Sequence, residues 1–430
     1  MLVVFVVGDI LGAGIYGLVG EVAGRVGGAI WASFLVAMML ALFTAFAYAE
    51  LVTKYPDAAG AALYANKAFK RPFVTFMVAF VVAVSGITSA STAARLFGGT
   101  YLAELGGVRV NVALAGLGFI LILTVINFRG IGESIKVNLT LTAVELGGLL
   151  IIIGIGATAL LRGVGEPARA LTFAADSPYV PGALLGGATL AFFSFLGFED
   201  SVNLAEETRE PSRSYPRALF GGLLFASVIY VLVALTAAMV VPTNVLAGSD
   251  APLLEVVQAG PVAVPPRVFA LLALVAVSNT ALINLIMASR LLYGMARQRI
   301  VPPVLSRVHP RRHTPFVSIG FVSLIAAVLI LTGELAALAR TTVVLLLLVF
   351  TIVNVAVLVL RSDQVDHHHF RAPTLAPVLG VASCVALLLQ QAPAIWARTG
   401  LLALLGVILW VVNRWIVGRV EEVDAAALMD

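Results

Sequence analysis

About twelve apolar runs follow one another along nearly the whole chain, and each is long enough to cross a bilayer as a helix of roughly 20 residues. The runs fall at about 2–24, 29–51, 72–101, 109–127, 136–161, 182–203, 216–241, 266–296, 315–333, 340–360, 373–391 and 396–417. Only 12% of the 430 residues are charged, whereas a soluble domain carries about 25%. The sequence therefore predicts an all-α polytopic membrane protein whose single membrane domain covers residues 1–430, with no separate catalytic domain.

Positive charge distinguishes the two ends of the predicted bundle. Most of the 27 Lys and Arg residues lie in alternate loops, for example at 54–71, 297–312 and 361–371. Because cytoplasmic loops carry the excess of basic residues, we expect these loops and both termini in the cytoplasm and the protein in the cell membrane. The chain opens Met1-Leu-Val-Val-Phe without a basic segment, which favours a first membrane helix over a cleaved signal.

Two of these runs contain residues that disfavour a continuous helix. The first run contains Gly12-Ala-Gly-Ile-Tyr-Gly17, and the sixth contains Phe192-Phe-Ser-Phe-Leu-Gly-Phe-Glu199. Unwound backbone at membrane depth is tolerated only where it is buried in protein or lines a cavity, and paired breaks of this kind mark transport sites. The sequence therefore predicts a substrate site formed by both breaks.

The glycines of the first break also fit two weaker interpretations. Gly12-x-Gly14-x-x-Gly17 matches the fingerprint of dinucleotide-binding enzymes, but that motif requires an acid about 20 residues further on for the ribose. The next acid after Glu21 is Glu50, so we expect no cofactor and no enzyme activity. Close helix packing through small residues accounts for one such motif, but it does not account for the second break.

The spacing of the breaks predicts an inverted repeat. The second broken run comes five spans after the first, so the two must cross the bilayer in opposite directions. Residues 1–165 and 182–361 therefore form a candidate inverted pair, followed by two further spans at 373–417. The halves share no convincing residue-level similarity, so this prediction depends on topology and on the positions of the breaks.

Four motifs, in order, resemble the amino acid–polyamine–organocation permeases. They are Tyr48-Ala-Glu-Leu51 with Gly60-Ala-Ala-Leu-Tyr64, then Phe193 to Glu199 leading to Glu206-Glu-Thr-Arg-Glu-Pro211, then Ser289 to Arg297, and last Leu360-Arg361 with Phe370-Arg-Ala-Pro373. The resemblance covers nearly the whole chain, and Gly12 to Glu21 looks closest to the cationic-amino-acid branch. It implies a leucine-transporter-type fold, a 5+5 inverted repeat with discontinuous first and sixth spans, and amino acid transport by alternating access.

An amino acid is a zwitterion, so both of its charges need partners inside a membrane. Backbone N–H groups freed at the start of a half-helix can hold the carboxylate, and the resemblance implies that freed carbonyls of Ile10, Phe193 and Leu196 hold the ammonium group. Relatives often have serine where this chain has Ala13, so backbone must supply that contact. The predicted substrate-binding residues are Ile10, Gly12, Ala13, Gly14, Ile15, Phe193, Phe195, Leu196 and Gly197, with Phe193 at the family's gate position.

Carboxyl groups inside membrane spans are candidates for proton coupling. Burial disfavours the charged form, so a carboxyl group that gains and loses a proton can couple transport to a proton gradient. Glu145 is the first candidate. Relatives commonly have a lysine near this position, and its charge can replace sodium. This chain has a glutamate instead, which puts the lysine-based mechanism in doubt and leaves Glu145 as a group that can carry the proton. Glu199 is the second. Asp9 and Asp200 are less certain, since they could equally stabilise the loosened helix ends.

The sequence leaves several transport modes open. A sodium site needs hard oxygen ligands, and Ser278 and Thr280 could supply them near the first break. Ion-independent exchange is the main alternative to proton symport. A channel is the alternative from another class, although channels usually conduct through rings around an oligomeric axis.

The third span bears on the substrate side chain. Ser85-Gly-Ile-Thr-Ser-Ala-Ser-Thr92 is small and polar, and no acid occurs between Asp57 and Glu104. A buried cationic side chain requires a carboxylate partner, so this span favours a neutral, fairly small amino acid. The resemblance to the cationic branch keeps a cationic substrate open.

The remaining polar features do not indicate a further site. The basic segment from Arg297 to His313 fits contact with anionic lipid headgroups rather than nucleic acid, and His367-His-His369 has no further metal ligand nearby in sequence. The single Cys384 excludes an intrachain disulfide. The charged run from Glu206 to Arg213 is expected to tie the inner end of the sixth span to another loop. The oligomeric state is left open.

Overall fold

The computed structural model describes residues 2–56, 60–108, 110–130, 135–173, 180–204, 208 and 210–418. Nearly all of them are helical, and the one β-bridge among them joins Gly27 to Phe173. In chain order the elements are α1 (Leu2–Ile10), α2 (Ala13–Val26), α3 (Ile30–Lys54), α4 (Gly60–Phe69), α5 (Pro72–Leu96), η1 (Phe97–Tyr101), α6 (Leu102–Gly106), α7 (Val112–Arg129), α8 (Ile135–Leu161), η2 (Pro167–Leu171), α9 (Val180–Phe193), η3 (Phe198–Leu204), α10 (Pro211–Val240), α11 (Thr243–Ala247), α12 (Pro252–Ala259), α13 (Pro266–Arg297), η4 (Pro303–Ser306), α14 (Phe316–Thr332), α15 (Leu335–Val359), η5 (Leu360–Ser362), α16 (Leu375–Leu389) and α17 (Pro393–Val417).

The helices confirm the predicted membrane-protein class. Within the described residues, eight helices are long and apolar enough to cross a bilayer, and the bent pair α1–α2 counts as a ninth span. Three shorter apolar helices, α9, α14 and α16, complete the set. Each predicted run coincides with one of these helices or pairs, because an apolar segment in lipid must satisfy its own backbone by forming a helix.

Both predicted breaks are present. The axis bends by 41° between α1 and α2, and Gly12 between them has extended backbone with φ −155° and ψ −160°. In the sixth run, α9 ends at Phe193 and the 3-10 helix η3 begins at Phe198. Gly197 in this gap has φ 120°, a conformation that favours glycine.

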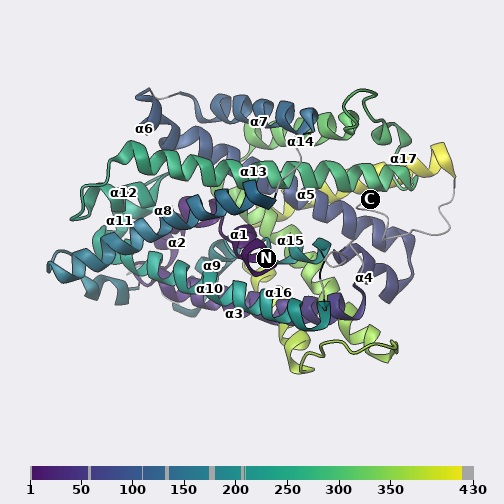
Figure 1. Cartoon of the computed structure of the whole chain (residues 1–430), viewed down its shortest axis with the longest axis horizontal. Coiled ribbons are helices and arrows are strands. Elements are labelled where there is room, and N and C mark those ends of the chain that lie inside the picture. Colours follow the sequence, from purple (N-terminus) through teal and green to yellow (C-terminus); the bar gives the residue numbers. More distant parts are fainter. Residues whose placement is uncertain are drawn as a thin grey trace.

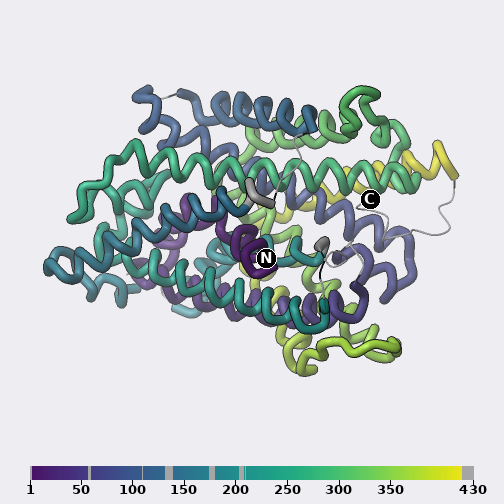
Figure 2. Tube along the Cα trace, in the orientation of Figure 1, coloured from purple at the N-terminus to yellow at the C-terminus, as the bar shows by residue number. Residues whose placement is uncertain are grey.

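The broken segments lie inside the bundle (Figures 1 and 2). The N-terminal helix α1 packs against α8, α10 and η3, and α2 packs against α9. On other sides, α5 packs against α13 and α15, and α7 lies beside α14 at one edge of the bundle (Figure 1). Longer intact helices therefore surround the two segments whose backbone is not fully helical.

The two breaks touch each other. A Cβ atom placed on Gly14 would lie 2.7 Å from the Cα atom of Ser194, and one placed on Gly197 would lie 2.4 Å from the carbonyl oxygen of Asp9. Such distances are too short for any side chain. Glycine at both positions therefore lets the backbones of the first and sixth runs approach each other directly.

Candidate functional site

A cavity of about 100 Å³ lies between the two breaks and the helices α5, α13 and α15. Most of the predicted substrate-binding residues line it, and so do three of the four carboxyl candidates for proton coupling, Asp9, Glu199 and Asp200. The predicted residues that line it are Ile10, Gly12, Ala13, Gly14, Phe193, Leu196 and Gly197. Ile15, Phe195, Glu145 and Ser278 are not among the lining residues.

At the first break, the N-terminus of α2 is turned toward α13. The backbone N–H of Ala13 donates to Oγ1 of Thr280 at 3.1 Å, so this group, predicted to bind a carboxylate, already has a partner. The N–H groups of Gly14 and Ile15 also belong to the first turn, where an α-helix supplies no internal acceptor. The positive end of α2 therefore borders the cavity through Ala13 and Gly14, beside the hydroxyl of Thr280.

Tyr230 on α10 connects the two breaks. Its hydroxyl lies 2.6 Å from the carbonyl oxygen of Ile10 and 3.0 Å from that of Ser194. The side chain is fully buried, and its ring packs against Phe34 and Phe195 at centroid distances of 5.8 and 5.4 Å. One phenol therefore serves carbonyl groups that helix breaks have left without a helical partner.

Replacing Tyr230 with phenylalanine is expected to slow transport by about tenfold or more. The ring packing stays, but the buried carbonyls of Ile10 and Ser194 lose the one hydroxyl hydrogen that they share, at a cost of about 1–3 kcal/mol. Initial rates of amino acid uptake in proteoliposomes measure this, with Tyr101→Phe as the matched control. Tyr101 is an equally buried tyrosine whose hydroxyl donates to the carbonyl of Tyr16 at 2.9 Å. Equal rates for the two variants would contradict a specific role of Tyr230 at the breaks.

At the second break, Glu199 stabilises loosened backbone. Its Oε2 accepts the N–H of Gly197 at 2.9 Å, and the N–H of Asp200 donates to the carbonyl of Gly197 at 3.0 Å. Glu199 and Asp200 both line the cavity, as does Asp9 from the first break. Acidic side chains from both broken runs thus reach the same space.

Ser194 is a site residue that sequence reasoning missed. Its Oγ is buried, has no hydrogen-bond partner among the described residues, and lies 2.6 Å from the position of a Cβ on Gly14. The residue lines the cavity. The sequence did contain an indication of this role, because Ser194 carries the one hydroxyl among residues 190–200. The prediction for this segment considered only the backbone and the aromatic side chains.

Glu145 lies outside the cavity in the interior of the bundle. Its side chain is 0% exposed, and its Oε1 accepts a hydrogen bond from Nδ2 of Asn279 at 3.2 Å. Its Oε2 is buried without a hydrogen-bond partner among the described residues. Asn279, which sequence reasoning did not single out, directly precedes Thr280, so α13 links Glu145 to the N–H of Ala13 at the break.

The aromatic residues of the second break have different environments. Phe193 lines the cavity, whereas Phe195 packs against Phe34 and Tyr230. Phe198 lies edge-on to Tyr48, with ring centroids 5.8 Å apart. Only Phe193 therefore has the position that a gate over the substrate requires, and its gating role stays a prediction.

The two residues predicted as weak sodium ligands are separated by the structure. The hydroxyl of Ser278 lies away from the cavity and donates to the carbonyl of Leu274 on its own helix at 2.7 Å, whereas Thr280 lines the cavity. His367 lies 3.1 Å from the carbonyl of Thr53, and the described residues contain no group of three potential metal ligands. Glu206, Glu207 and Arg209, predicted to tie the sixth span to a loop, lie outside the described residues.

A helical membrane bundle with two unwound segments beside a central cavity is typical of proteins that move small solutes across a membrane. Residues 1–413 match the family described as amino acid permease, and the chain therefore belongs to this family. Membership confirms the resemblance seen in the sequence motifs. It makes amino acid transport across the membrane, rather than enzymatic catalysis, the function of the chain.

Individual relatives extend this similarity over most of the chain. A branched-chain amino acid permease of Bacillus subtilis (strain 168) is 26% identical over 405 residues, which cover 89% of this chain and 85% of the relative. The chloroplastic cationic amino acid transporter 9 of Arabidopsis thaliana is 30% identical over 333 residues, covering 72% of this chain but only 56% of that longer protein. An uncharacterized transporter of Mycobacterium tuberculosis is 29% identical over 425 residues, covering 98% and 92% of the two chains.

Proposed function

We propose that this protein is a secondary active transporter that moves an amino acid by alternating access, with the substrate held between the two helix breaks. The observation that carries the proposal is the cavity lined by residues of both breaks. Unwound backbone at the centre of a bundle supplies donors at one break and acceptors at the other. Residues 1–165 and 182–361 are proposed to be the two inverted repeats, each of which contributes one broken span to the site.

The proposed substrate pose follows from the polar groups at the breaks. The carboxylate accepts from the N–H groups of Gly14 and Ile15 at the positive end of α2, and the hydroxyl of Ser194 lies close enough to add a third donor. The ammonium group donates to carbonyls of the second break, at Phe193 and Leu196. The carbonyl of Ile10 already accepts from Tyr230 and has a second lone pair for the substrate.

The opposite wall of the cavity supports a neutral substrate side chain. It is formed by small, polar and apolar residues of α5, α13 and α15, among them Gly86, Asn284, Met287 and Leu346. Among the described residues of this wall, no carboxyl group is available to pair with a cationic side chain, which would need such a partner. The acids that do line the cavity belong to the two broken runs, where the proposed ammonium site is. The relatives named above include both branched-chain and cationic amino acid carriers, so the uptake panel must contain both classes.

The structure supports an assignment to the inward-facing conformation. The cavity extends from the breaks along α4 and the adjoining halves of α5 and α13, toward the end that the basic loops predict to be cytoplasmic. At the other end the packing is tight: a Cβ on Gly20 would lie 2.3 Å from the carbonyl oxygen of Leu246, and one on Gly28 would lie 1.8 Å from that of Arg169.

Proton coupling is proposed to involve Glu145. A buried carboxylate is costly unless it is paired, and no salt bridge to Glu145 forms among the described residues. A proton taken up at this position therefore changes the stability of the contact between α8 and α13. Through Asn279 and Thr280, that contact reaches the N-terminus of α2, where the substrate carboxylate is proposed to bind.

The test is uptake by purified protein in liposomes under imposed gradients. A panel of neutral and cationic amino acids is offered with an inward proton gradient, an inward sodium gradient or neither. We expect saturable accumulation of small neutral amino acids that requires the proton gradient. Accumulation driven by sodium alone would contradict proton coupling, and transport only against internal amino acid would establish exchange instead.

A further inference from the structure

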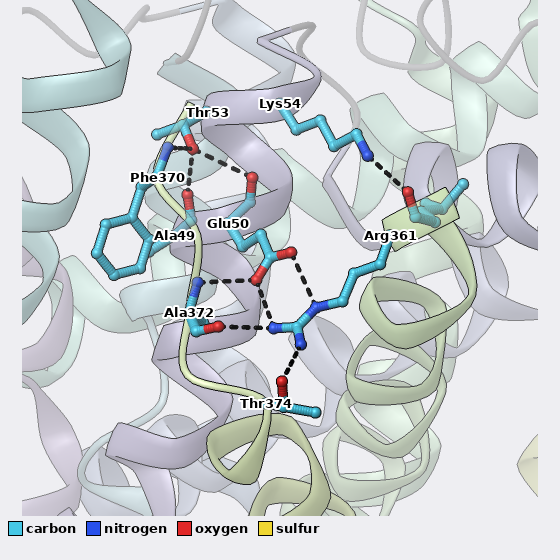
Figure 3. Close-up of polar contacts among 9 residues, drawn as sticks. Ala49, Glu50, Thr53, Lys54, Arg361, Phe370, Ala372 and Thr374 are labelled. Carbon is cyan, nitrogen blue, oxygen red and sulfur yellow. Dashed lines mark hydrogen bonds and ion pairs between the residues drawn. The ribbon is translucent and has the colours of Figure 1, made fainter. Parts of the chain in front are cut away.

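Two motifs that the transport site does not use meet where α3 and α15 end (Figure 3). Glu50 belongs to the last turns of α3, and Arg361 lies in η5, directly after α15. They are 311 residues apart in sequence, yet they form a salt bridge with an N–O distance of 3.0 Å. We call this pair, together with its partners on residues 363–374, the clasp.

The pair is buried and its geometry is bidentate. Nε of Arg361 donates to Oε1 of Glu50 at 3.2 Å, and Nη2 donates to Oε2 at 3.0 Å. The side chains are only 2% exposed for Glu50 and 12% for Arg361. Two parallel hydrogen bonds between charged groups fix orientation as well as distance, so the clasp defines how the ends of α3 and α15 face each other.

The same two side chains also fasten the connection between α15 and α16. Oε2 of Glu50 accepts the N–H of Ala372 at 2.9 Å, and Arg361 donates to the carbonyl of Ala372 and to Oγ1 of Thr374, both at 2.7 Å. Figure 3 shows Ala372 and Thr374 arranged around the guanidinium group. One carboxylate and one guanidinium group thus join α3, η5 and the segment that leads into α16.

The last turn of α3 adds further contacts. Oγ1 of Thr53 accepts the N–H of Phe370 at 3.0 Å, and the ammonium group of Lys54 donates to the carbonyls of Leu360 and Asp363. The hydroxyl of Tyr55 donates to the carboxylate of Asp363. Burial, followed by this hydrogen bond, raises the pKa of Tyr55, so the phenol remains a donor at physiological pH.

The helices joined by the clasp also form a wall of the transport cavity. Tyr48, two residues before Glu50 on α3, lines the cavity and lies edge-on to Phe350 of α15, with centroids 5.8 Å apart. Both rings contact Phe198 of η3, at 5.8 Å for Tyr48 and 5.5 Å for Phe350. The second break therefore packs on a pair of rings whose helices the clasp holds together.

We propose that Glu50 and Arg361 are positioning residues for transport, which keep α3, α15 and the start of α16 as one rigid wall against which η3 moves. The inference rests on the proposed function, because it assigns the clasp a part in the same conformational cycle. Loss of the clasp leaves the substrate groups at the breaks in place but lets the wall move with η3. Binding is then retained while turnover is lost.

The test compares Glu50→Gln, Arg361→Gln and the double variant with the parent protein. Equilibrium binding of a radiolabelled transported amino acid to purified protein gives Kd, and uptake into liposomes gives Vmax. We expect Vmax to fall about tenfold or more with Kd changed less than about threefold. The double variant should be no worse than either single variant, because the two residues act through one contact.

Glu166→Gln is the matched control, since it breaks the salt bridge between Glu166 and Arg169, in which Glu166 is 71% exposed. An exposed ion pair contributes little to the stability of a protein, so this variant should transport at the parental rate. Vmax within twofold of the parent for Glu50→Gln would overturn the proposal. So would a joint loss of Vmax, binding and thermal stability, which would make the clasp a folding element only. Failure of the parent protein to transport would instead reject the proposed function.

Discussion

Replacing Gly197 with alanine is expected to reduce transport to near background. The residue has φ 120°, and a side chain in such backbone costs about 1–3 kcal/mol. In addition, its Cβ would lie 2.4 Å from the carbonyl oxygen and 2.8 Å from the carbonyl carbon of Asp9. Both atoms are backbone of the first broken run, so relief of the contact requires the two breaks to separate. Initial uptake rates in proteoliposomes, normalised to the amount of inserted protein, measure the effect.

Gly118→Ala provides the control for this variant. Gly118 lies within α7, and no atom outside its own helix neighbourhood lies within 4 Å of a Cβ at this position. Alanine is a better helix former than glycine, so we expect unchanged transport and equal or higher thermal stability. Transport by Gly197→Ala above about half of the parental rate would contradict the close approach of the two breaks, because an overlap of this size must displace one of them.

The second large effect is expected for Glu145→Gln, which should abolish accumulation driven by a proton gradient while preserving exchange of substrate across the membrane. Glutamine retains the side-chain oxygen that accepts from Asn279 at 3.2 Å, but it cannot gain or lose a proton. The binding groups at the breaks remain. We therefore expect the ratio of internal to external amino acid to approach one under an inward proton gradient, as judged by steady-state uptake.

The same measurement ranks the three predicted coupling residues. Glu199→Gln and Asp9→Asn alter carboxyl groups that line the cavity, in the broken runs where the ammonium group is proposed to bind. Both variants should lower proton-driven uptake and exchange together, whereas Glu145→Gln should lower proton-driven uptake and leave exchange intact. Glu334→Gln, on an exposed residue before α15, is the control. Full proton-driven accumulation by Glu145→Gln would reject its assignment and make Glu199 the first candidate.

The membrane fold could be predicted from the sequence because each span carries its own signal. A run of roughly 20 apolar residues has no stable alternative to a helix in lipid, and this constraint acts locally. The breaks were also visible, since Gly12 and Gly197 interrupt apolar runs. Their exact form depends on contacts with other helices, such as that between Gly197 and Asp9.

The polar partners of the breaks could not be predicted because they come from distant helices. Tyr230 is 220 residues from Ile10 and Asn279 is 134 residues from Glu145, and no local pattern relates them. Side-chain direction decides the outcome even on a single helix. Ser278 and Thr280 are two residues apart, so they point to nearly opposite sides of α13, and only Thr280 reaches the first break.

The salt bridge between Glu50 and Arg361 could not be predicted from the sequence either. The motifs around Glu50 and Arg361 were each recognised in the sequence, as the end of one span and the connection after another. Nothing in either motif indicates that they contact each other, because Glu50 and Arg361 are 311 residues apart. The contact follows from the packing of α3, α15 and α16, which only the three-dimensional structure supplies.

If the two breaks hold an amino acid within a carrier that alternates between two openings, the protein must exchange substrate across the membrane. Counterflow measures this exchange: liposomes containing purified protein are preloaded with unlabelled amino acid, and a trace of the labelled amino acid is added outside without any ion gradient. We expect a transient, saturable accumulation of label above its external concentration, which is lost in Gly197→Ala. Non-saturable entry of label that does not depend on preloading would indicate a channel and would rule out a carrier.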